Sequence, residues 1–322
     1  MKKIVALGVV VFGLVGLYGA AWLWAAGQVT GIVEQYKTAD GYQNPRITCG
    51  SFAISGFPFG FDLSCTNASV EQNDVMVSVE RLQAAIEVWQ PTHVLVFAQS
   101  PVQITDSFTG SRSRVDFTSA QASARLDGWR IGRVSLVVEE PVVTDTVLED
   151  RPVARATHFE AHLVDMPDRH DAAAGLASLA HYAEIKGLSV PASDITDGTA
   201  TIEAEITNLP DDVRTYGEAD LLRRWQGAGG RLLLTGIKGN DGPDNFDITG
   251  TLGLDSTARP EGQLKLHSTG VVEKINYLFP PEYRNMIVGN RAEDGSYSQT
   301  LNIAAGIVMA GLIPVGQFPP LY

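Results

Sequence analysis

The sequence predicts a mainly β protein, in which an N-terminal transmembrane helix precedes a large antiparallel sheet with a few docked helices. Three observations lead to this fold class. The chain opens with an unbroken apolar run, most of the remainder alternates apolar and polar residues with a period of two, and short connections separate the alternating stretches. Short connections favour antiparallel pairing, because parallel strands need crossover helices.

The first element is the apolar run from Ile4 to Gly27, which follows two lysines and meets no charge before Glu34. About twenty apolar residues span a hydrocarbon core of roughly 30 Å, and the lysines favour a cytoplasmic N-terminus. The competing interpretation is a cleaved signal peptide, because Gly19–Ala21 are small enough for a peptidase site. We favour an anchor, since Trp22 and Trp24 extend the run as aromatic residues at a membrane interface do. Both interpretations export the rest of the chain.

Helical spacing continues beyond the apolar run, through Val29, Ile32 and Tyr36, to an end at Asp40 and Gly41. The exported part is acidic: without its two N-terminal lysines the chain has 22 basic and 37 acidic residues, a net charge of −15. Such a charge repels nucleic acid and anionic lipid head groups. Membrane contact is therefore expected through residues 4–27 or through apolar surface.

The two cysteines predict a disulfide-closed hairpin. Cys49 and Cys65 lie symmetrically about Phe57, so an antiparallel turn there places them opposite each other, with Ser51 facing Leu63 and Ala53 facing Phe61. Cross-strand partners have the separation that a disulfide requires, and cysteines in an exported domain usually pair. Two free buried thiols or a pair of metal ligands are the alternatives.

Alternation with a period of two then predicts a series of strands. Val75–Val79 and Leu82–Val88 alternate in opposite phase, which indicates a turn or bulge near Glu80 and Arg81. The further strands expected before the middle of the chain are 93–97, 102–105, 113–117, 121–127, 131–139 and 156–164.

An alanine-rich segment interrupts this pattern, and we expect a helix over Ala172–Lys186 that Gly187 ends. It divides the chain into four parts. These are an anchor at 1–27, a β-rich region with the disulfide hairpin at 28–165, a helical connection at 166–190 and a second β-rich region at 191–322.

The second β-rich region is expected to begin with a strand over Thr199–Thr207. A capping box of Thr215 and Glu218 then predicts a helix that buries Ala219, Leu222 and Trp225 and ends at Gly227. The next two strands alternate most regularly: they bury Phe246, Ile248, Leu252 and Leu254, and then Leu264 and Leu266, on either side of a hairpin loop.

The chain has no charge from Ser296 to Tyr322. We expect a helix over Tyr297–Ala310 laid on the sheet and a final strand over Leu312–Phe318, ended by two prolines at an edge. A second membrane span is the alternative, but Asn302 and Pro314 interrupt the apolar part, which is short for a span.

No common catalytic motif is present, and the best candidate for chemistry is His158, Glu160 and His162. They alternate on one face of a strand and offer two imidazoles and a carboxylate to a metal ion, with Asp165, Asp168 and His170 close behind in sequence. The opposite face is apolar, so the solvent side of a half-buried strand explains the pattern better. We therefore expect no metal, no cofactor and no catalytic residue.

Two weaker candidate sites occur elsewhere in the chain. The acidic loop Asn240–Asp247 has oxygen ligands for calcium but lacks the spacing of a calcium loop, so a solvated hairpin turn is favoured. Arg125, Arg130 and Arg133 could bind a phosphate, although spaced positive charges on an exposed strand are common.

Several segments together resemble a known family. They are the helix with its aromatic extension, the hairpin Gly56–Phe59 between two cysteines, WQGAGGRLLL at 225–234, ITGTLGLDSTARPEGQLKL at 248–266 and GLIPVGQFPPLY at 311–322. The chain resembles the DUF2125 family of uncharacterised bacterial envelope proteins over almost its whole length. The late hairpin and the terminal strand are similar, more weakly, to AsmA-like proteins.

The resemblance implies an elongated, twisted, AsmA-like sheet with an apolar concave side, and a role in outer-membrane lipid homeostasis or phospholipid passage. It carries no catalytic residue, and this chain is shorter than AsmA-like proteins that could bridge two membranes. We therefore expect a bacterial inner-membrane protein with a periplasmic body that binds a phospholipid, an acyl chain or an envelope protein partner. A metal-dependent hydrolase built on His158, Glu160 and His162 and a purely structural envelope module are the alternatives.

Overall fold

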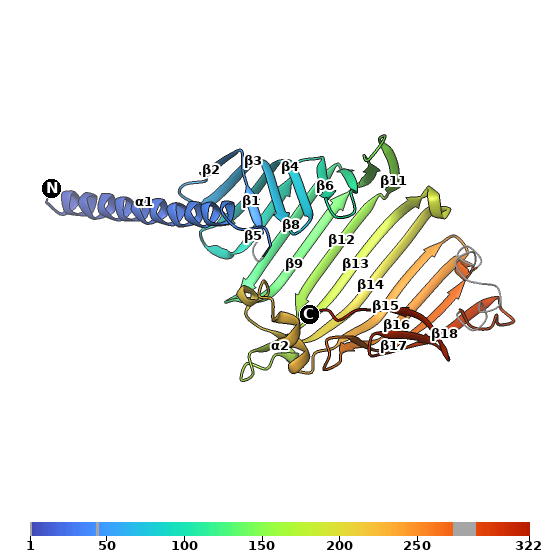
Figure 1. Cartoon of the computed structure of the whole chain (residues 1–322). Helices are drawn as coiled ribbons and strands as arrows, with labels where there is room; N and C mark the ends of the chain where they lie inside the picture. The colour runs from blue at the N-terminus through green and yellow to red at the C-terminus, as the bar shows by residue number, and fades with distance from the viewer. Residues whose placement is uncertain (1, 43–44, 273–287) are drawn as a thin grey trace.

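A computed structural model of the chain describes residues 2–42, 45–272 and 288–322 (Figure 1). A long helix, α1 (Lys2–Lys37), leads into one antiparallel sheet that contains all twenty strands of the described residues. The first part of α1 projects beyond the sheet, and its later turns run beside the first strands (Figure 1). The helix is long and apolar enough to cross a membrane, and Val10–Lys37 is not buried against the protein. The expected helix and the expected fold class are confirmed.

The first half of the sheet contains strands β1 to β12. They are β1 (Arg46–Thr48), β2 (Ser51–Ser55), β3 (Gly60–Gln72), β4 (Val75–Glu87), β5 (Gln90–Ala98), β6 (Val102–Asp106), β7 (Arg112–Asp116), β8 (Ser119–Asp127), β9 (Arg130–Glu139), β10 (Val142–Asp145), β11 (Arg151–Arg155) and β12 (His158–Asp165).

Among its described residues, the second half contains eight strands and the short helix α2 (Leu221–Gly227). The strands are β13 (Leu176–Val190), β14 (Ile195–Pro210), β15 (Leu232–Asp241), β16 (Asp244–Leu254), β17 (Pro260–Thr269), β18 (Ser296–Ala304), β19 (Ile307–Ala310) and β20 (Ile313–Gln317). Three single turns of 3-10 helix lie at Pro167–Arg169, Pro191–Ser193 and Val213–Thr215.

A continuous crease crosses the first half of the sheet. Here a long strand is interrupted in the middle, so that its two parts count as separate strands that pair with the same neighbours. The interruptions lie at the same level in five such pairs: β1 and β2, β5 and β6, β7 and β8, β9 and β10, and β11 and β12. Backbone hydrogen bonds continue across the crease, from Gln99 N to Arg81 O, from Glu140 N to Thr157 O and from Thr157 N to Lys186 O. Left-handed residues mark it at Asn67, Glu140 and Gly187.

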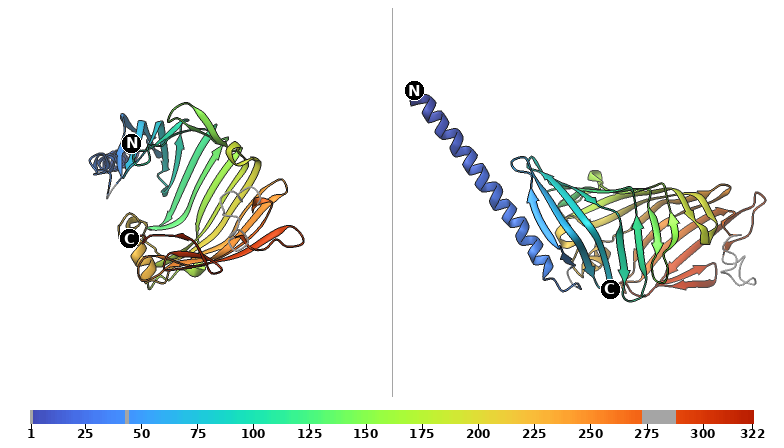
Figure 2. Two further views of the ribbon diagram at one scale, coloured as in Figure 1. Left: turned by 45° about the vertical axis from the view of Figure 1, so that its right-hand side comes forward. Right: turned by 90° about the horizontal axis from the view of Figure 1, so that it is seen from above.

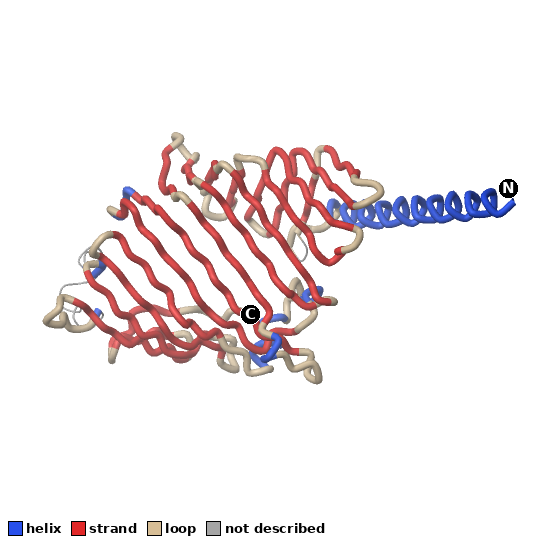
Figure 3. Tube along the Cα trace, turned by 180° about the vertical axis from the view of Figure 1, so that it is seen from behind, coloured by secondary structure: helices blue, strands red, loops and turns tan. Residues whose placement is uncertain are grey.

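The sheet is strongly curled rather than flat. Figure 2 shows the last strands swinging back toward the side where the chain begins, and Figure 3 shows the outer side of the central strands. The helix α2 lies at one end of the strands, where Trp225 Nε1 donates a hydrogen bond to Thr207 O (2.7 Å). The last residue is there too, with the guanidinium of Arg223 over the Tyr322 ring at 5.4 Å. Ala177 and Leu179, both 1% exposed, belong to this most buried part of the sheet.

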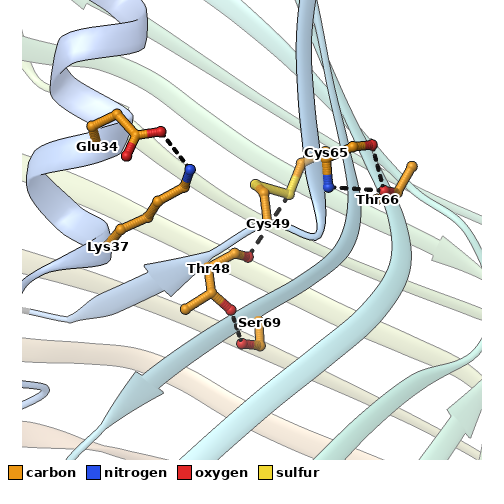
Figure 4. Close-up of a disulfide and its surroundings, with 8 residues drawn as sticks. Glu34, Lys37, Thr48, Cys49, Cys65, Thr66 and Ser69 are labelled. Carbon is orange, nitrogen blue, oxygen red and sulfur yellow. Dashed lines mark hydrogen bonds and ion pairs between the residues drawn. A yellow bond between two sulfur atoms is a disulfide. The ribbon is translucent and has the colours of Figure 1, made fainter.

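The disulfide between Cys49 and Cys65 is confirmed, with the two Cα atoms 5.4 Å apart (Figure 4). The predicted hairpin register is wrong by three residues, since Ser51 faces Thr66 and Ala53 faces Ser64. Cys49 therefore does not face Cys65 as a ladder partner. It occupies the interruption between β1 and β2, so the disulfide joins the edge of the sheet to β3 at the start of the crease.

Two predicted helices are wrong because both segments are strands. The segment Ala172–Lys186 lies largely in β13, which pairs along its length with β12 and β14, so the sheet continues through the expected helical connection at 166–190. The segment Tyr297–Ala310 forms β18 and β19. In both, the two neighbouring strands satisfy the backbone groups that a helix would satisfy internally, which outweighs local helix propensity.

Other predictions differ in detail. The strands expected in both halves are present, and the final strand β20 is confirmed. The sequence predicts a turn or bulge near Glu80 and Arg81. The strand β4 continues through both residues, so there is no turn, but the ladder with β3 is interrupted there: Glu80 lies opposite the left-handed Asn67 (φ 47°), on the crease. The capping box is also wrong: α2 begins after Asp220, and the hydroxyl of Thr215 donates to Asp212 O.

Candidate functional site: an apolar trough

The strand register sorts the side chains of the sheet into two faces. Residues that face each other on neighbouring antiparallel strands project to the same side, so a row of partners can be followed from strand to strand. One row crosses the sheet from β2 to β17 and contains only apolar residues. Its members are Ile54, Leu63, Ala84, Val96, Ala122, Leu136, Ala161, Ala183, Ile202, Ile237, Ile248 and Leu266.

A second row runs beside this central row, two residues along each strand. Its members are Phe61, Ile86, Val94, Ala124, Val134, Leu163, His181, Ala204, Leu234, Gly250, Leu264, Leu301 and Ala310. A third row lies on the other side, from Cys65 and Leu82 through Phe159 and Ile185 to Phe246. We call the face made by these three rows the apolar trough. At about 4.8 Å between neighbouring strands, the central row is roughly 50 Å long.

The apolar trough is partly buried and partly open to solvent. Ala183 and Ala204 are buried members of its rows, and Leu179 and Leu254 are buried beyond the rows on the same face. Open stretches remain between them: Leu136 is 38% and Ile202 37% exposed, both in the central row. Single exposed apolar side chains are ordinary on a protein surface, but a contiguous apolar patch of this length marks a binding surface.

The trough deepens at one end of strands β13 to β16. A pocket of about 300 Å³ lies there, lined mainly by apolar atoms of Leu188, Ile195, Ala200, Phe246 and Val271. Ala200 and Phe246 belong to the third row, so the pocket continues the apolar face. Its volume is at the lower limit of small-molecule sites.

A single ionisable side chain, His181, interrupts the second row. Its partners on the adjoining strands are Leu163 and Ala204, which offer no hydrogen bond. Burial lowers the pKa of His181, because the charged imidazolium loses its hydration there. His181 is therefore neutral near pH 7 and gives the trough a polar group without a charge.

The opposite face is polar, and it carries the predicted trio. The row next to the central one on this face reads Gln83, Phe97, Gln121, Val137, Glu160, Glu184, Thr201, Lys238, Asp247, His267 and Ser298. His158, Glu160 and His162 all project to it, whereas Phe159, Ala161 and Leu163 project into the trough. The solvent-side interpretation of the trio is therefore supported by the register.

The trio forms hydrogen bonds and ion pairs within the sheet. Both imidazole Nε2 atoms approach the same carboxylate oxygen, Glu160 Oε2, at 3.2 Å from His162 and 3.7 Å from His158. The Nδ1 atom of His162 forms a hydrogen bond with Ser135 Oγ (2.9 Å), and that of His158 forms one with Glu139 (3.0 Å). The hydrogen bond with Glu139 raises the pKa of His158, and the one with His162 lowers the pKa of Glu160.

No group of three His, Cys, Asp or Glu in the described part of the chain is arranged to hold a metal. The hydrolase alternative therefore gains no support from this geometry. The ion pairs are those of a partly solvated strand face.

The other predicted site residues have structural partners. The guanidinium of Arg130 lies 3.0 Å from Asp165 and 2.7 Å from Asp127, and it contacts His170 Nδ1 at 2.8 Å. Arg125 and Arg133 are ladder partners on the polar face, so the structure unites two of the three arginines. Whether they bind phosphate stays a hypothesis.

The acidic loop is the turn between β15 and β16, as the sequence indicates. Asp241 accepts hydrogen bonds from Thr196 N (3.3 Å) and Asp197 N (3.1 Å), so it ties the end of β15 to the beginning of β14. Its carboxylate thus has a structural role.

The helix α1 contacts the beginning of the trough directly. Trp22 Nε1 donates a hydrogen bond to Gly60 O (3.0 Å), and its ring stacks on Phe61 with the centroids 5.1 Å apart. Phe61 is the first member of the second row. The apolar face therefore starts at the side chains of the apolar helix.

Sequence reasoning found the alternation in most strands but missed the rows, because register between distant strands is not visible in a single sequence. It also missed His181, which lies in the segment predicted as a helix. The alternation of Ala177, Leu179, His181, Ala183 and Ile185 with polar or small residues was the available signal.

A comparison with protein families matches residues 22–319 to the family described as "Uncharacterized protein conserved in bacteria (DUF2125)". No curated protein and no solved structure matches the chain. The weaker similarity to AsmA-like proteins therefore stays a prediction. Because the match runs from residue 22 of α1 to residue 319 and covers the whole sheet, the chain belongs to the DUF2125 family.

Proposed function

We propose that this protein is a non-enzymatic, inner-membrane-anchored periplasmic protein whose apolar trough binds the acyl chains of phospholipid in envelope homeostasis. The observation that carries the proposal is the central row, an uninterrupted apolar path that is half-open to solvent and crosses the sheet from β2 to β17. A soluble body gains nothing from such an exposed path unless an apolar ligand or partner covers it.

An acyl chain fits the path better than a compact ligand does. The three rows of side chains in the trough run from strand to strand with His181 as their one ionisable group, whereas a compact ligand needs a closed pocket with several polar contacts. Burial contributes about 0.8 kcal/mol per methylene, so a dozen methylenes half covered by the trough gain about 5 kcal/mol. This suits reversible binding.

The negative charge of the protein favours recognition of the acyl chain of a lipid over recognition of an anionic head group. The exported part carries a net charge of −15, which repels anionic lipid and nucleic acid alike. The apolar helix supplies the membrane attachment that the acidic surface cannot supply.

The decisive experiment places the same polar group on either face. Leu136→Gln with Ile202→Gln interrupts the central row at its two exposed positions, and Val137→Gln with Thr201→Gln puts the same groups on the polar face of the same strands. Full-length protein is delipidated in detergent and given phospholipid with a fluorescent acyl chain. We expect uptake to fall several-fold in the trough variant and to match the wild type in the polar-face variant.

Lipid that co-purifies with each protein is measured in parallel by mass spectrometry. The proposal fails if delipidated wild-type protein takes up no labelled phospholipid and the purified protein carries none. Equal uptake by the two double variants would also overturn it, because binding would then not involve the trough. An envelope protein partner or a structural role would be indicated instead, which crosslinking in cells distinguishes.

A further inference from the structure

We infer that the tips of the first two hairpins insert into the outer interface of the membrane that α1 crosses, so that the trough begins at the lipid surface. The tips are the turn between β2 and β3, with Phe57 and Phe59, and the turn between β4 and β5, with Trp89. We call these three side chains the aromatic tip. The inference concerns a membrane contact and does not depend on whether the trough binds lipid.

The aromatic tip is exposed and apolar. Phe57 is 54%, Phe59 69% and Trp89 61% exposed, and the rings of Phe59 and Trp89 lie 6.4 Å apart, so the two turns form one patch. No charge occurs between Ser55 and Phe61. Exposed aromatic side chains on an otherwise acidic body are typical of a surface that meets a membrane interface.

Contacts with α1 set the depth of this patch. The hydroxyl of Tyr18 donates a hydrogen bond to Pro58 O, and the Trp22 ring packs edge-on against Phe57 with the centroids 5.6 Å apart. Both helix residues belong to the apolar run Ile4–Gly27. The hairpin is therefore attached to the membrane-crossing part of the helix rather than to its aqueous extension.

The rise per residue of the helix gives the depth of Tyr18 and Trp22 in the membrane, and therefore the depth of the turn that contacts them. At 1.5 Å per residue, a hydrocarbon core of roughly 30 Å that starts at Ile4 ends near residue 24. Tyr18 then lies about 9 Å and Trp22 about 3 Å inside the outer boundary, so a turn that contacts both reaches the boundary. The part of α1 before Tyr18 is only about 24 Å long, too short to cross the core by itself.

A second consequence concerns the trough. Phe61 lies next to the tip and opens the second row, and the Trp22 ring stacks on it. With the tip at the interface, the row from Phe61 starts at the acyl chains of the outer leaflet. A lipid could then enter the trough without crossing water.

The test measures depth at the tip in the full-length protein. Both native cysteines are in the disulfide, so a single introduced cysteine takes a spin label selectively. Phe59→Cys and Trp89→Cys label the tip. Phe108→Cys is the matched control, because Phe108 is an aromatic residue that is even more exposed (84%), in the turn between β6 and β7 at the other end of the strands.

The labelled proteins are reconstituted in vesicles of phosphatidylethanolamine and phosphatidylglycerol. We expect the ratio of oxygen to nickel-chelate collision rates to be several-fold higher at positions 59 and 89 than at position 108, since oxygen concentrates in the acyl region and the chelate in water. Equal, water-like ratios at all three positions would overturn the inference. So would labels at 59 and 89 that both reagents fail to reach, because another protein surface, such as a second copy, would then cover the tip.

Discussion

The environments of His181 in the trough and His158 on the polar face shift the pKa values of their imidazoles in opposite directions. His181 is the only ionisable side chain in the second row, from Phe61 to Ala310, and burial lowers its pKa. His158, on the polar face of the neighbouring strand, has its pKa raised by the hydrogen bond with Glu139. The two histidines therefore contribute to the pH dependence of stability with opposite signs.

We predict that His181→Leu reduces the loss of stability on acidification. In the wild type, the unfolded chain protonates the imidazole of His181 more readily than the folded chain does. The stability contributed by neutral His181 is therefore present above the unfolded-state pKa of about 6.5, and it is lost as the pH falls from there toward the lower pKa of the folded state. Without the imidazole, the part of the pH dependence of stability that His181 contributes disappears. Urea unfolding in detergent at about pH 7.5 and about pH 5.5 measures the difference.

The control is His158→Gln. Because the pKa of His158 is raised in the folded state, its protonation stabilises the fold below about pH 6.5, and this stabilisation is lost as the pH rises through the pKa of the folded state. The stability of this variant should therefore fall more on acidification than that of the wild type. If His181→Leu and the wild type lose the same stability between the two pH values, His181 is not desolvated in the trough.

At the scale of elements, the crease determines how the first half of the sheet bends. Strands interrupted at one level can turn over the trough while their backbone hydrogen bonds continue across the bend. The crease starts at the disulfide, which fastens the interrupted edge strand to β3, and ends at Gly187 in β13. At Gly187 the chain takes a left-handed conformation (φ 60°), and a Cβ atom would lie 2.6 Å from Thr157 Cγ2.

We predict that Gly187→Ala destabilises the protein by about 2–4 kcal/mol. The left-handed conformation costs an L residue about 1–2 kcal/mol, and the overlap with Thr157 adds a similar amount. Urea unfolding followed by far-ultraviolet circular dichroism measures the change.

Gly128→Ala separates the two contributions, because Gly128 has the same conformation (φ 63°) and nothing within 4 Å of its added Cβ. It should cost about 1–2 kcal/mol, for the backbone alone. Equal losses in the two variants would mean that Thr157 moves freely and that the crease is not closely packed at Gly187.

Particular elements show how far sequence reasoning reached at this scale. The strands around Phe246–Leu254 and Leu264–Leu266 were predicted with their inner faces, because a period of two on a half-buried strand is a local signal. The strands β13 and β18 were predicted as helices, because alanine-rich or uncharged segments favour helix locally. Their pairing partners on both sides decide the conformation, and those partners are distant in sequence.

At the scale of the whole molecule, the arrangement of helix and sheet relates the anchor to the trough. The helix α1 projects from the edge where the sheet begins; the strands up to the middle of the sheet lie progressively farther from it, and the end of the chain curls back (Figures 1 and 2). The proposed function requires the sheet to lie on the far side of the bilayer from the two N-terminal lysines.

We predict that the C-terminus is periplasmic. Alkaline phosphatase fused after Tyr322 should be active and green fluorescent protein at the same position dark, because each folds productively on one side of the membrane. The same phosphatase fusion to residues 28–322 should be inactive. An active cytoplasmic reporter on the full chain would contradict both the topology and the proposed function.

The sequence by itself determined the apolar helix, the acidic mainly β body, the pairing of Cys49 with Cys65 and the two-faced character of most strands. These follow from composition and from patterns within a few residues. Only the tertiary structure decided the register that aligns Ile54 through Leu266 in one row, the crease that bends the strands and the contact of Trp22 with Phe61. The physical reason is that each depends on hydrogen bonds and packing between segments far apart in the chain, and a shift of one residue in any pairing would move a whole strand's apolar side chains out of the trough.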